Sequence, residues 1–140
     1  MIKKGNVQDI PAIAALMVRL WPHQTVEAME AELREMMKEE DIAFFLQEDQ
    51  AFAQCQLRHD YVEGTDSSPV GYLEGIYVAE ELRHQGVARE LVRACENWAK
   101  EKGCQEFASD CELTNTQSLK FHLGVGFREA NRIICFTKKL

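Results

Sequence analysis

The segment 83–88, Arg-His-Gln-Gly-Val-Ala, has residue types and a spacing suited to binding a phosphate group. It follows an apolar run at 72–78 and opens a helical pattern, which predicts a strand, a turn and the start of a helix. The first N–H groups of a helix have no intrahelical acceptor, and the positive end of the helix dipole lies there. Gly86 has no Cβ to keep a ligand away from the backbone, and Arg83 is a cationic donor suited to phosphate.

Three phosphate-binding patterns can be compared with this turn. A P-loop needs a second glycine and a Lys-Ser/Thr pair, and a dinucleotide-binding turn needs three glycines; neither set is present. The spacing of Arg83, Gly86 and Ala88 after an apolar strand resembles instead the pyrophosphate loop of the GNAT superfamily of N-acetyltransferases. The resemblance implies that acetyl-CoA binds here. For these six residues alone, an ordinary strand-turn-helix with a glycine at the helix start is the alternative.

Glu74 is a lone carboxylate within an otherwise apolar predicted strand. Burying an unpaired charge is costly, which favours a functional role. Strict alternation would place Glu74 on the same face as Ile76 and Val78. A bulge at Gly75 would break that register and re-aim the carboxylate, and the strand of GNAT proteins that this one resembles has such a bulge.

The order of predicted elements describes one domain over residues 1–140. Apolar residues at helical spacing predict helices from Asn6 or Asp9 to Trp21, over 25–38, over 83–102 and from Thr114 or Asn115 to 123. Apolar or alternating runs predict strands at 1–4, 41–46, 51–58, 70–78 and 105–110, with one or two more within 128–138. This order matches the GNAT fold, which is α+β (mixed α/β) with a central mixed, mostly antiparallel sheet and helices on both faces. The polar segment 59–69 is a long loop of the kind that is often functional.

Composition narrows the class of ligand. Sixteen basic and twenty-three acidic residues give a net charge of −7, without a basic stripe for nucleic acid, and an acidic field favours cationic ligands.

No apolar run approaches the roughly 20 residues that span a bilayer, and residues 1–5 lack a signal segment, so a cytoplasmic protein without a membrane partner is expected. Five cysteines without a Cys-x-x-Cys pair indicate neither a disulfide framework nor a metal site.

The resemblance can be narrowed to one branch of the superfamily. The segments 57–70, 73–78 and 103–110, with Leu20-Trp21-Pro22, are similar to the aminoglycoside 6'-N-acetyltransferase family, and the similarity extends over almost the whole chain. It implies transfer of the acetyl group of acetyl-CoA to the 6'-amine of an aminoglycoside antibiotic, a small polycation, and hence antibiotic resistance. Another amine acceptor (a polyamine, a peptide N-terminus or lysine) and a binding module without turnover are the alternatives.

Site residues follow from this resemblance. The implied acetyl-CoA site consists of Ile76, Tyr77, Val78, Arg83, His84, Gln85, Gly86, Val87, Ala88, Arg89 and Asn115. The implied aminoglycoside site consists of Trp21, His23, Tyr61, Glu74 and Asp110, while a further acidic position of some relatives is Asn131 here. From sequence alone, Trp21 could also be a core aromatic, Asp110 a turn cap and Asn115 a helix cap.

The expected reaction is direct attack of the amine on the thioester in a ternary complex. Glu74 is the expected proton acceptor. Relatives place a tyrosine on the last helix to protonate the leaving thiolate; His122 stands at that position here, although it could also be an ordinary helix-surface residue. The resemblance further implies a gap between 72–78 and 105–110 for the pantetheine arm, and a homodimer formed through the alternating apolar residues of 128–140.

Overall fold

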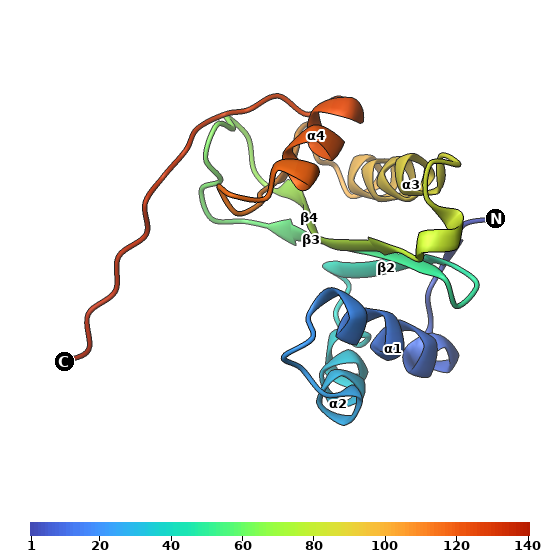
Figure 1. Cartoon of the computed structure of the whole chain (residues 1–140). Coiled ribbons are helices and arrows are strands. Elements are labelled where there is room, and N and C mark those ends of the chain that lie inside the picture. Colours follow the sequence, from blue (N-terminus) through green and yellow to red (C-terminus); the bar gives the residue numbers. More distant parts are fainter.

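A five-stranded sheet in the order β1-β2-β3-β4-β5 forms the middle layer of the protein, shown in Figure 1 as a computed structural model of residues 1–140. The strands are β1 (Lys3–Lys4), β2 (Ile42–Gln47), β3 (Ala51–Arg58), β4 (Val70–Val78) and β5 (Phe107–Ser109). Neighbours from β1 to β4 are antiparallel, whereas β5 is parallel to β4. The expected mixed, mostly antiparallel sheet is therefore confirmed.

Helices cover both faces of this sheet (Figure 1). α1 (Ile10–Leu20) and α2 (Val26–Met36) lie on one face, and α3 (Val87–Glu101) and α4 (Thr116–Gly124) on the other. The helices of each face pack into a separate apolar cluster with the sheet. The three-layer arrangement expected from the order of elements is confirmed.

Alternation along the strands divides the sheet's side chains between the two clusters. Phe44 and Phe52 are buried with α1 and α2, whereas Ala43 and Cys55 are buried beneath α3. The small residues on the second side leave room for the apolar face of α3. Because β4 packs directly against α3, the sheet and the helix hold the turn between them in place.

Polar side chains fix where the helices begin. Asn6 and Asp9 form a capping box around a 3-10 turn, η1 (Val7–Asp9), directly before α1. The Asn115 Oδ1 atom accepts a hydrogen bond of 3.0 Å from the Ser118 N–H and caps α4. Both caps were expected from the sequence, because these side chains satisfy N–H groups that the helix itself leaves free.

The helix expected from Arg83 begins later, at Val87. A 3-10 turn, η2 (Glu80–Leu82), follows β4, and the backbone then has φ values of +64° at His84 and +83° at Gly86. A residue with positive φ cannot continue a right-handed helix. Residues 83–86 are therefore a loop that leads into the helix.

The strands expected within 128–138 are absent, because no strand of this chain pairs with that segment. Residues 128–140, named here the C-terminal arm, extend away from the body of the molecule (Figure 1). The side chains of Ile133, Ile134 and Phe136 are 68%, 80% and 87% exposed. A strand forms only where a neighbour bonds its backbone groups, so apolar alternation without a neighbour leaves an extended chain.

Cys55, Cys95 and Cys104 are buried, whereas Cys111 and Cys135 are exposed, and all five are free thiols. No group of three or more His, Cys, Asp or Glu side chains is placed to hold a metal ion. None of the helices combines the length and the apolar character needed to cross a membrane.

Candidate functional site

A bulge in β4 directs Glu74 away from the regular alternation of the strand. Gly75 lies opposite Gln54 of β3 and Leu73 lies opposite Cys55, so Glu74 has no partner across the strand pair. One strand thus holds an extra residue, as in a β-bulge. The bulge expected beside Gly75 is confirmed, and it explains how a carboxylate in an apolar strand avoids the core.

Trp21 lies directly against this bulge. A Cβ added at Gly75 would come within 2.8 Å of the Trp21 ring, so only glycine lets the indole lie on the strand backbone. The ring is half-buried and meets Phe52 edge to face, with the two ring centroids 6.4 Å apart. Trp21 is therefore a partly buried aromatic at the end of α1 whose ring packs on Phe52 and on the β4 backbone at Gly75.

Arg58, at the end of β3, holds the Glu74 carboxylate. Its Nε donates to Oε2 at 3.0 Å and its Nη2 donates to Oε1 at 2.8 Å. The hydrogen bond with Glu74 is the main reason why the pKa of Arg58 is raised. Arg58 was not predicted from the sequence. It is nevertheless the single charged residue of β3, which pairs with β4, and a lone carboxylate in an apolar strand needs a countercharge.

Tyr72 and Asp110 complete this cluster. The Arg58 Cζ atom lies 3.4 Å from the centroid of the Tyr72 ring. The Tyr72 hydroxyl donates a hydrogen bond to Asp110 Oδ2. Burial and this hydrogen bond raise the pKa of Tyr72 far above its usual value, so the hydroxyl remains protonated. Two predicted substrate residues, Glu74 and Asp110, are thus connected through Arg58 and Tyr72, and neither of these two was predicted as a site residue.

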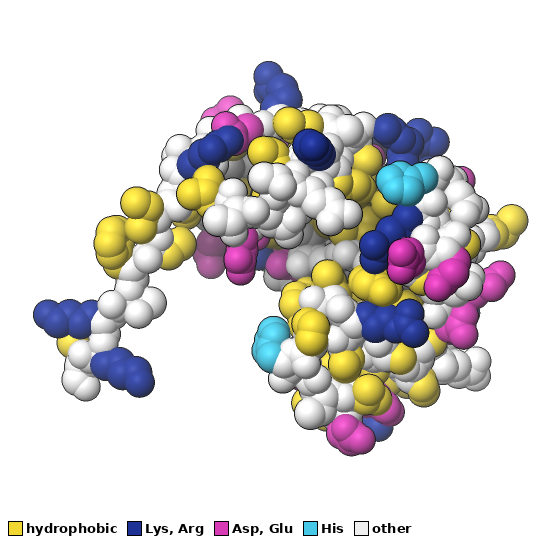
Figure 2. Space-filling view, viewed as in Figure 1, with side chains coloured by type: hydrophobic (Ala, Val, Ile, Leu, Met, Phe, Trp, Pro, Cys, Tyr) yellow, Lys and Arg dark blue, Asp and Glu magenta, His cyan; other side chains and the backbone are white.

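Two other predicted substrate residues lie at the surface. Tyr61 belongs to the loop after β3 and is 75% exposed, with its hydroxyl accepting from the Gly64 N–H at 3.4 Å. His23 is exposed after the end of α1. Neither forms a hydrogen bond with the Glu74 cluster. Figure 2 shows the surface hollowed below α4 at this end of the sheet, with acidic side chains at the rim.

The turn before α3 has the free donors expected of a phosphate site. The first helical bond runs from the Glu90 N–H to the Gly86 carbonyl at 3.0 Å, so the amides of Val87, Ala88 and Arg89 lack a helical acceptor. No atom lies within 4 Å of a Cβ placed on Gly86, so a ligand has room to approach. These amides fit a diphosphate.

Two side chains brace this turn. The Arg83 Nε atom donates to the Val78 carbonyl at 2.9 Å, which ties the turn to the end of β4. Gln85 Nε2 donates to the Glu81 carbonyl at 2.8 Å. His84 is exposed and has a left-handed backbone. Arg83 thus uses its Nε donor for the backbone, while its other guanidinium nitrogens have no hydrogen-bond partner within the protein.

β4 is open on one side next to this turn. Its parallel pairing with β5 covers only Gly71 to Leu73, so residues 74–78, named here the open edge of β4, have no strand beside them. Ile76, Tyr77 and Val78 lie on this edge and pair on their other side with β3. An extended ligand arm could therefore bond to the free backbone groups of β4, starting from the phosphate turn.

His122 faces the end of β5 from α4. Its Nδ1 lies 2.7 Å from the Ser118 carbonyl oxygen and its Nε2 lies 2.8 Å from Ser109 Oγ. Because a carbonyl can only accept, Nδ1 carries a proton. Ser109 Oγ is also 3.2 Å from the Leu73 carbonyl oxygen, at the last paired residue of β4. The half-buried His122 is therefore connected to the start of the open edge of β4.

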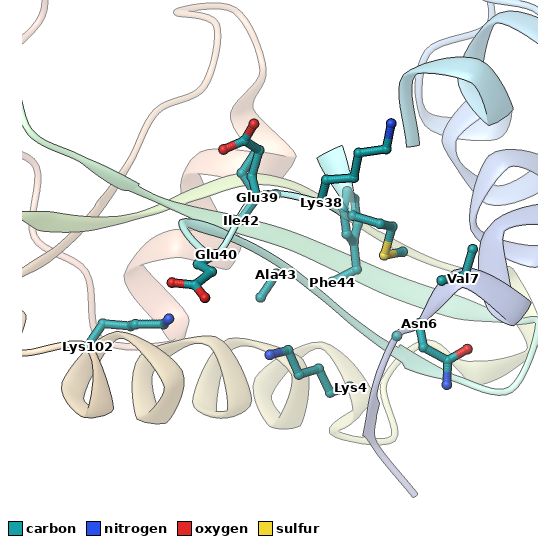
Figure 3. Close-up of a pocket in the computed structure, with 12 residues that line it drawn as sticks. Lys4, Asn6, Val7, Lys38, Glu39, Glu40, Ile42, Ala43, Phe44 and Lys102 are labelled. Carbon is teal, nitrogen blue, oxygen red and sulfur yellow. The ribbon is translucent and has the colours of Figure 1, made fainter. Parts of the chain in front are cut away.

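A cavity at the opposite edge of the sheet contains none of the predicted site residues. Its volume is about 490 Å³, and Lys4, Lys38, Glu39, Glu40 and Lys102 are among its lining residues (Figure 3). Figure 3 shows charged side chains of both signs around β2 and the end of α3. The residues that could perform chemistry lie instead at the β4–β5 end of the sheet.

Comparison with known proteins agrees with this geometry. The acetyltransferase (GNAT) family profile matches residues 10–127. The aminoglycoside N(6')-acetyltransferase type 1 of Serratia marcescens is 40% identical over 145 residues, covering 100% of this chain and 99% of the relative. The enzyme of the same name from Salmonella typhimurium is 41% identical over 142 residues, with 99% and 98% covered.

Solved structures show the same fold. The structure of AAC(6')-Iy in complex with the bisubstrate analog CoA-S-monomethyl-acetylneamine matches with a TM-score of 0.94 and 38% identity, covering 100% of this chain and 98% of that one. AAC(6')-Ih from Acinetobacter baumannii matches with a TM-score of 0.93 and 34% identity, with 100% and 98% covered. The chain therefore belongs to the acetyltransferase (GNAT) family, and within it to the aminoglycoside 6'-N-acetyltransferases.

Proposed function

We propose that this protein transfers the acetyl group of acetyl-CoA to the 6'-amine of aminoglycoside antibiotics, which makes it a resistance enzyme. The main support for this proposal is the open edge of β4, which connects the free amides at the start of α3 with the carboxylate cluster around Glu74. A thioester arm lying along this edge would end beside anionic side chains. A relative's bisubstrate analogue joins coenzyme A to an acetylated aminoglycoside fragment, as this arrangement requires.

The acceptor site offers what a polycationic aminosugar needs. Glu74 and Asp110 supply negative charge, and Trp21 supplies a flat apolar wall next to Glu74. Tyr61 and His23 are exposed at the surface and are proposed to close over the sugar rings. The net charge of −7 further favours a cationic small molecule over nucleic acid.

The amine must lose a proton to attack. An amine with a pKa of about 10.4 is neutral in only about one molecule in a thousand at pH 7. Glu74 is the proposed proton acceptor, directly or through a water molecule. A backbone N–H of Ile76, Tyr77 or Val78 would stabilise the oxyanion. Holding both substrates together supplies up to roughly 7–11 kcal/mol through proximity.

The leaving thiolate needs a proton, and His122 is the proposed donor. Its ring is oriented by the Ser118 carbonyl and the Ser109 hydroxyl. A protonated ring would give its Nε2 proton to the thiolate, directly or through Ser109. Asn115, which caps α4, would keep the helix that carries His122 in place, and it is also a proposed cofactor-binding residue.

A homodimer and a cytoplasmic location complete the proposal. The exposed apolar side chains of the C-terminal arm would be buried by a second copy, which explains why they alternate with polar residues outside any sheet of the single chain. The cytoplasm supplies acetyl-CoA. No membrane or nucleic-acid partner enters the reaction.

A steady-state screen of amine acceptors tests the proposed function. Thiol release from acetyl-CoA is measured with kanamycin, tobramycin, spermidine, an N-terminally free peptide and lysine. Release with an aminoglycoside, at a kcat/KM well above that of the other amines, is expected. Release only with another amine would change the acceptor class, and release with none, above the hydrolysis background, would contradict the enzymatic activity.

A further inference from the structure

We infer that Arg58 is a positioning residue of the acceptor site. It orients Glu74, and it lowers the fraction of the reacting amine that is held in the ammonium form. The inference rests on the proposed function, because it concerns an amine bound beside Glu74. It adds a cationic residue to a site that otherwise consists of anionic, aromatic and imidazole groups.

Arg58 is restrained on two sides, which suits a positioning role. Two parallel hydrogen bonds of 2.8 and 3.0 Å fix its guanidinium against both oxygens of Glu74. The face of the same group lies 3.4 Å from the centroid of the Tyr72 ring. Arg58 lies opposite Val70 in the strand register, so its side chain extends along β4 across Tyr72 to reach the bulge.

The ionisable groups facing Arg58 can be counted from the strands around it. Glu74 and Tyr72 come from β4 and Asp110 follows β5, and these are the groups that act on its charge. The next residue, His59, lies 3.0 Å from Asp41 Oδ2 and is engaged there. The cluster thus has two carboxylates and one guanidinium, with a protonated tyrosine between them.

This charge balance bears on a conflict within the reaction. Carboxylates attract the ammonium form of the substrate, but they also make it harder for that amine to lose its proton. The guanidinium is charged at every working pH, and a positive charge in the same cluster disfavours a second one beside it. Arg58 therefore weakens binding of the cation and increases the fraction of amine that is neutral and able to attack.

Glu74 keeps its capacity to accept a proton in this arrangement. Each carboxylate oxygen has two lone pairs, and Arg58 uses one on each oxygen. The remaining lone pairs are available to the amine. The Glu74 side chain is 16% exposed and that of Arg58 is 39% exposed, so the pair is reachable from solvent at the acceptor end.

Two substitutions separate the charge of Arg58 from its forked geometry. Arg58→Gln removes the charge, whereas Arg58→Lys keeps the charge and loses the two parallel bonds. The dependence of kcat on pH is measured with tobramycin and saturating acetyl-CoA. For Arg58→Gln, we expect the acidic limb of the kcat–pH profile to move to higher pH by on the order of one unit. The KM for tobramycin should be unchanged or lower.

Arg58→Lys is expected to keep the acidic limb in place and to lose a few-fold in kcat because Glu74 is less well oriented. Arg34→Gln is the matched control, since Arg34 also forms a pair with a glutamate, Glu30, at 3.7 Å on the exposed side of α2. It should change neither the pH profile nor KM. Acetyl-CoA binding and thermal unfolding are measured to test whether each variant is folded. If Arg58→Gln is not folded, Arg58→Met is used in its place.

The outcomes distinguish this inference from the proposed function. If Arg58→Gln is active and the acidic limb of its kcat–pH profile lies at the wild-type pH, the proposed effect of the Arg58 charge on the amine is overturned. A limb displaced equally in Arg58→Lys would overturn it as well, because the charge is still present there. Wild-type protein that releases no thiol with any aminoglycoside would overturn the proposed function and, with it, the role of Arg58.

Discussion

His122 Nε2 lies 2.8 Å from Ser109 Oγ, and this hydrogen bond joins α4 to the last residue of β5. The other ring nitrogen is fixed by the Ser118 carbonyl at 2.7 Å. Ser109 in turn lies 3.2 Å from the carbonyl oxygen of Leu73, where the pairing of β4 with β5 ends. A protonated His122 could therefore donate at both nitrogens, with the Ser109 hydroxyl free to pass a proton toward the open edge of β4.

His122→Gln should lower kcat by about a hundredfold or more, because a general acid typically contributes about 10²- to 10⁴-fold. Ser109→Ala should give a smaller loss, since the ring keeps its bond with the Ser118 carbonyl. Both variants should bind acetyl-CoA as the wild type does, measured by calorimetry. Lys120→Ala is the control, because Lys120 is an exposed residue of α4 that forms no hydrogen bond with the ring. An unchanged kcat in His122→Gln would remove the imidazole from the reaction.

Glu74→Gln should reduce kcat by about tenfold or more while acetyl-CoA binding persists, because glutamine cannot take the proton of the amine. Steady-state kinetics with tobramycin and calorimetry with coenzyme A measure the two effects separately. Glu30→Gln removes a carboxylate from an ion pair outside the site and should leave both unchanged. Full activity of Glu74→Gln would show that another group, or solvent, accepts the proton.

Gly86→Ala should weaken coenzyme A binding and destabilise the fold by about 1–2 kcal/mol, since Gly86 has a φ of +83° that residues with a Cβ tolerate poorly. Calorimetry with coenzyme A and thermal unfolding are the measurements. Gly103→Ala is the matched control, because Gly103, after the end of α3, also has a positive φ of +92° and a Cβ there meets no atom within 4 Å. It should cost similar stability and leave coenzyme A binding unchanged. Wild-type affinity in Gly86→Ala would contradict a phosphate site built on this turn.

Removal of residues 133–140 should convert a dimer into a folded monomer, measured by light scattering and thermal unfolding. The truncation keeps Asn131, whose Nδ2 donates to Glu63 Oε1 at 2.9 Å, and removes exposed apolar side chains. Replacing Lys138 and Lys139 with alanine in the full chain is the control. Wild-type protein that is a monomer at all concentrations would contradict pairing through the arm.

Much of the site could be predicted from the sequence because it depends on local patterns. The spacing of Arg83, Gly86 and Ala88 indicated the phosphate turn, and the order of apolar runs indicated the fold. Glu74 was conspicuous because an apolar strand rarely carries a single charge. The start of α3 was misplaced by four residues, since the positive φ at His84 is not specified by its residue type.

The partners of these residues could not be predicted in the same way. Arg58 and Ser109 lie 16 and 13 positions from the side chains that they hold, Glu74 and His122. Such contacts depend on strand register and on how far β5 pairs with β4, which no local pattern records. The absent strands of the C-terminal arm have a related cause: alternation shows that a segment can pair, but not with what.

The sequence by itself determined the layers of the fold, the phosphate turn and the chemical types of the site residues, because helix and strand periods and glycine positions act within a few neighbouring residues. Only the tertiary structure decided that Glu74 forms an ion pair with Arg58, that Tyr72 joins Asp110 to the same cluster and that His122 is oriented by Ser109. These relationships arise where a bulge, a short parallel pairing and a helix end meet, and they are fixed by packing across the sheet.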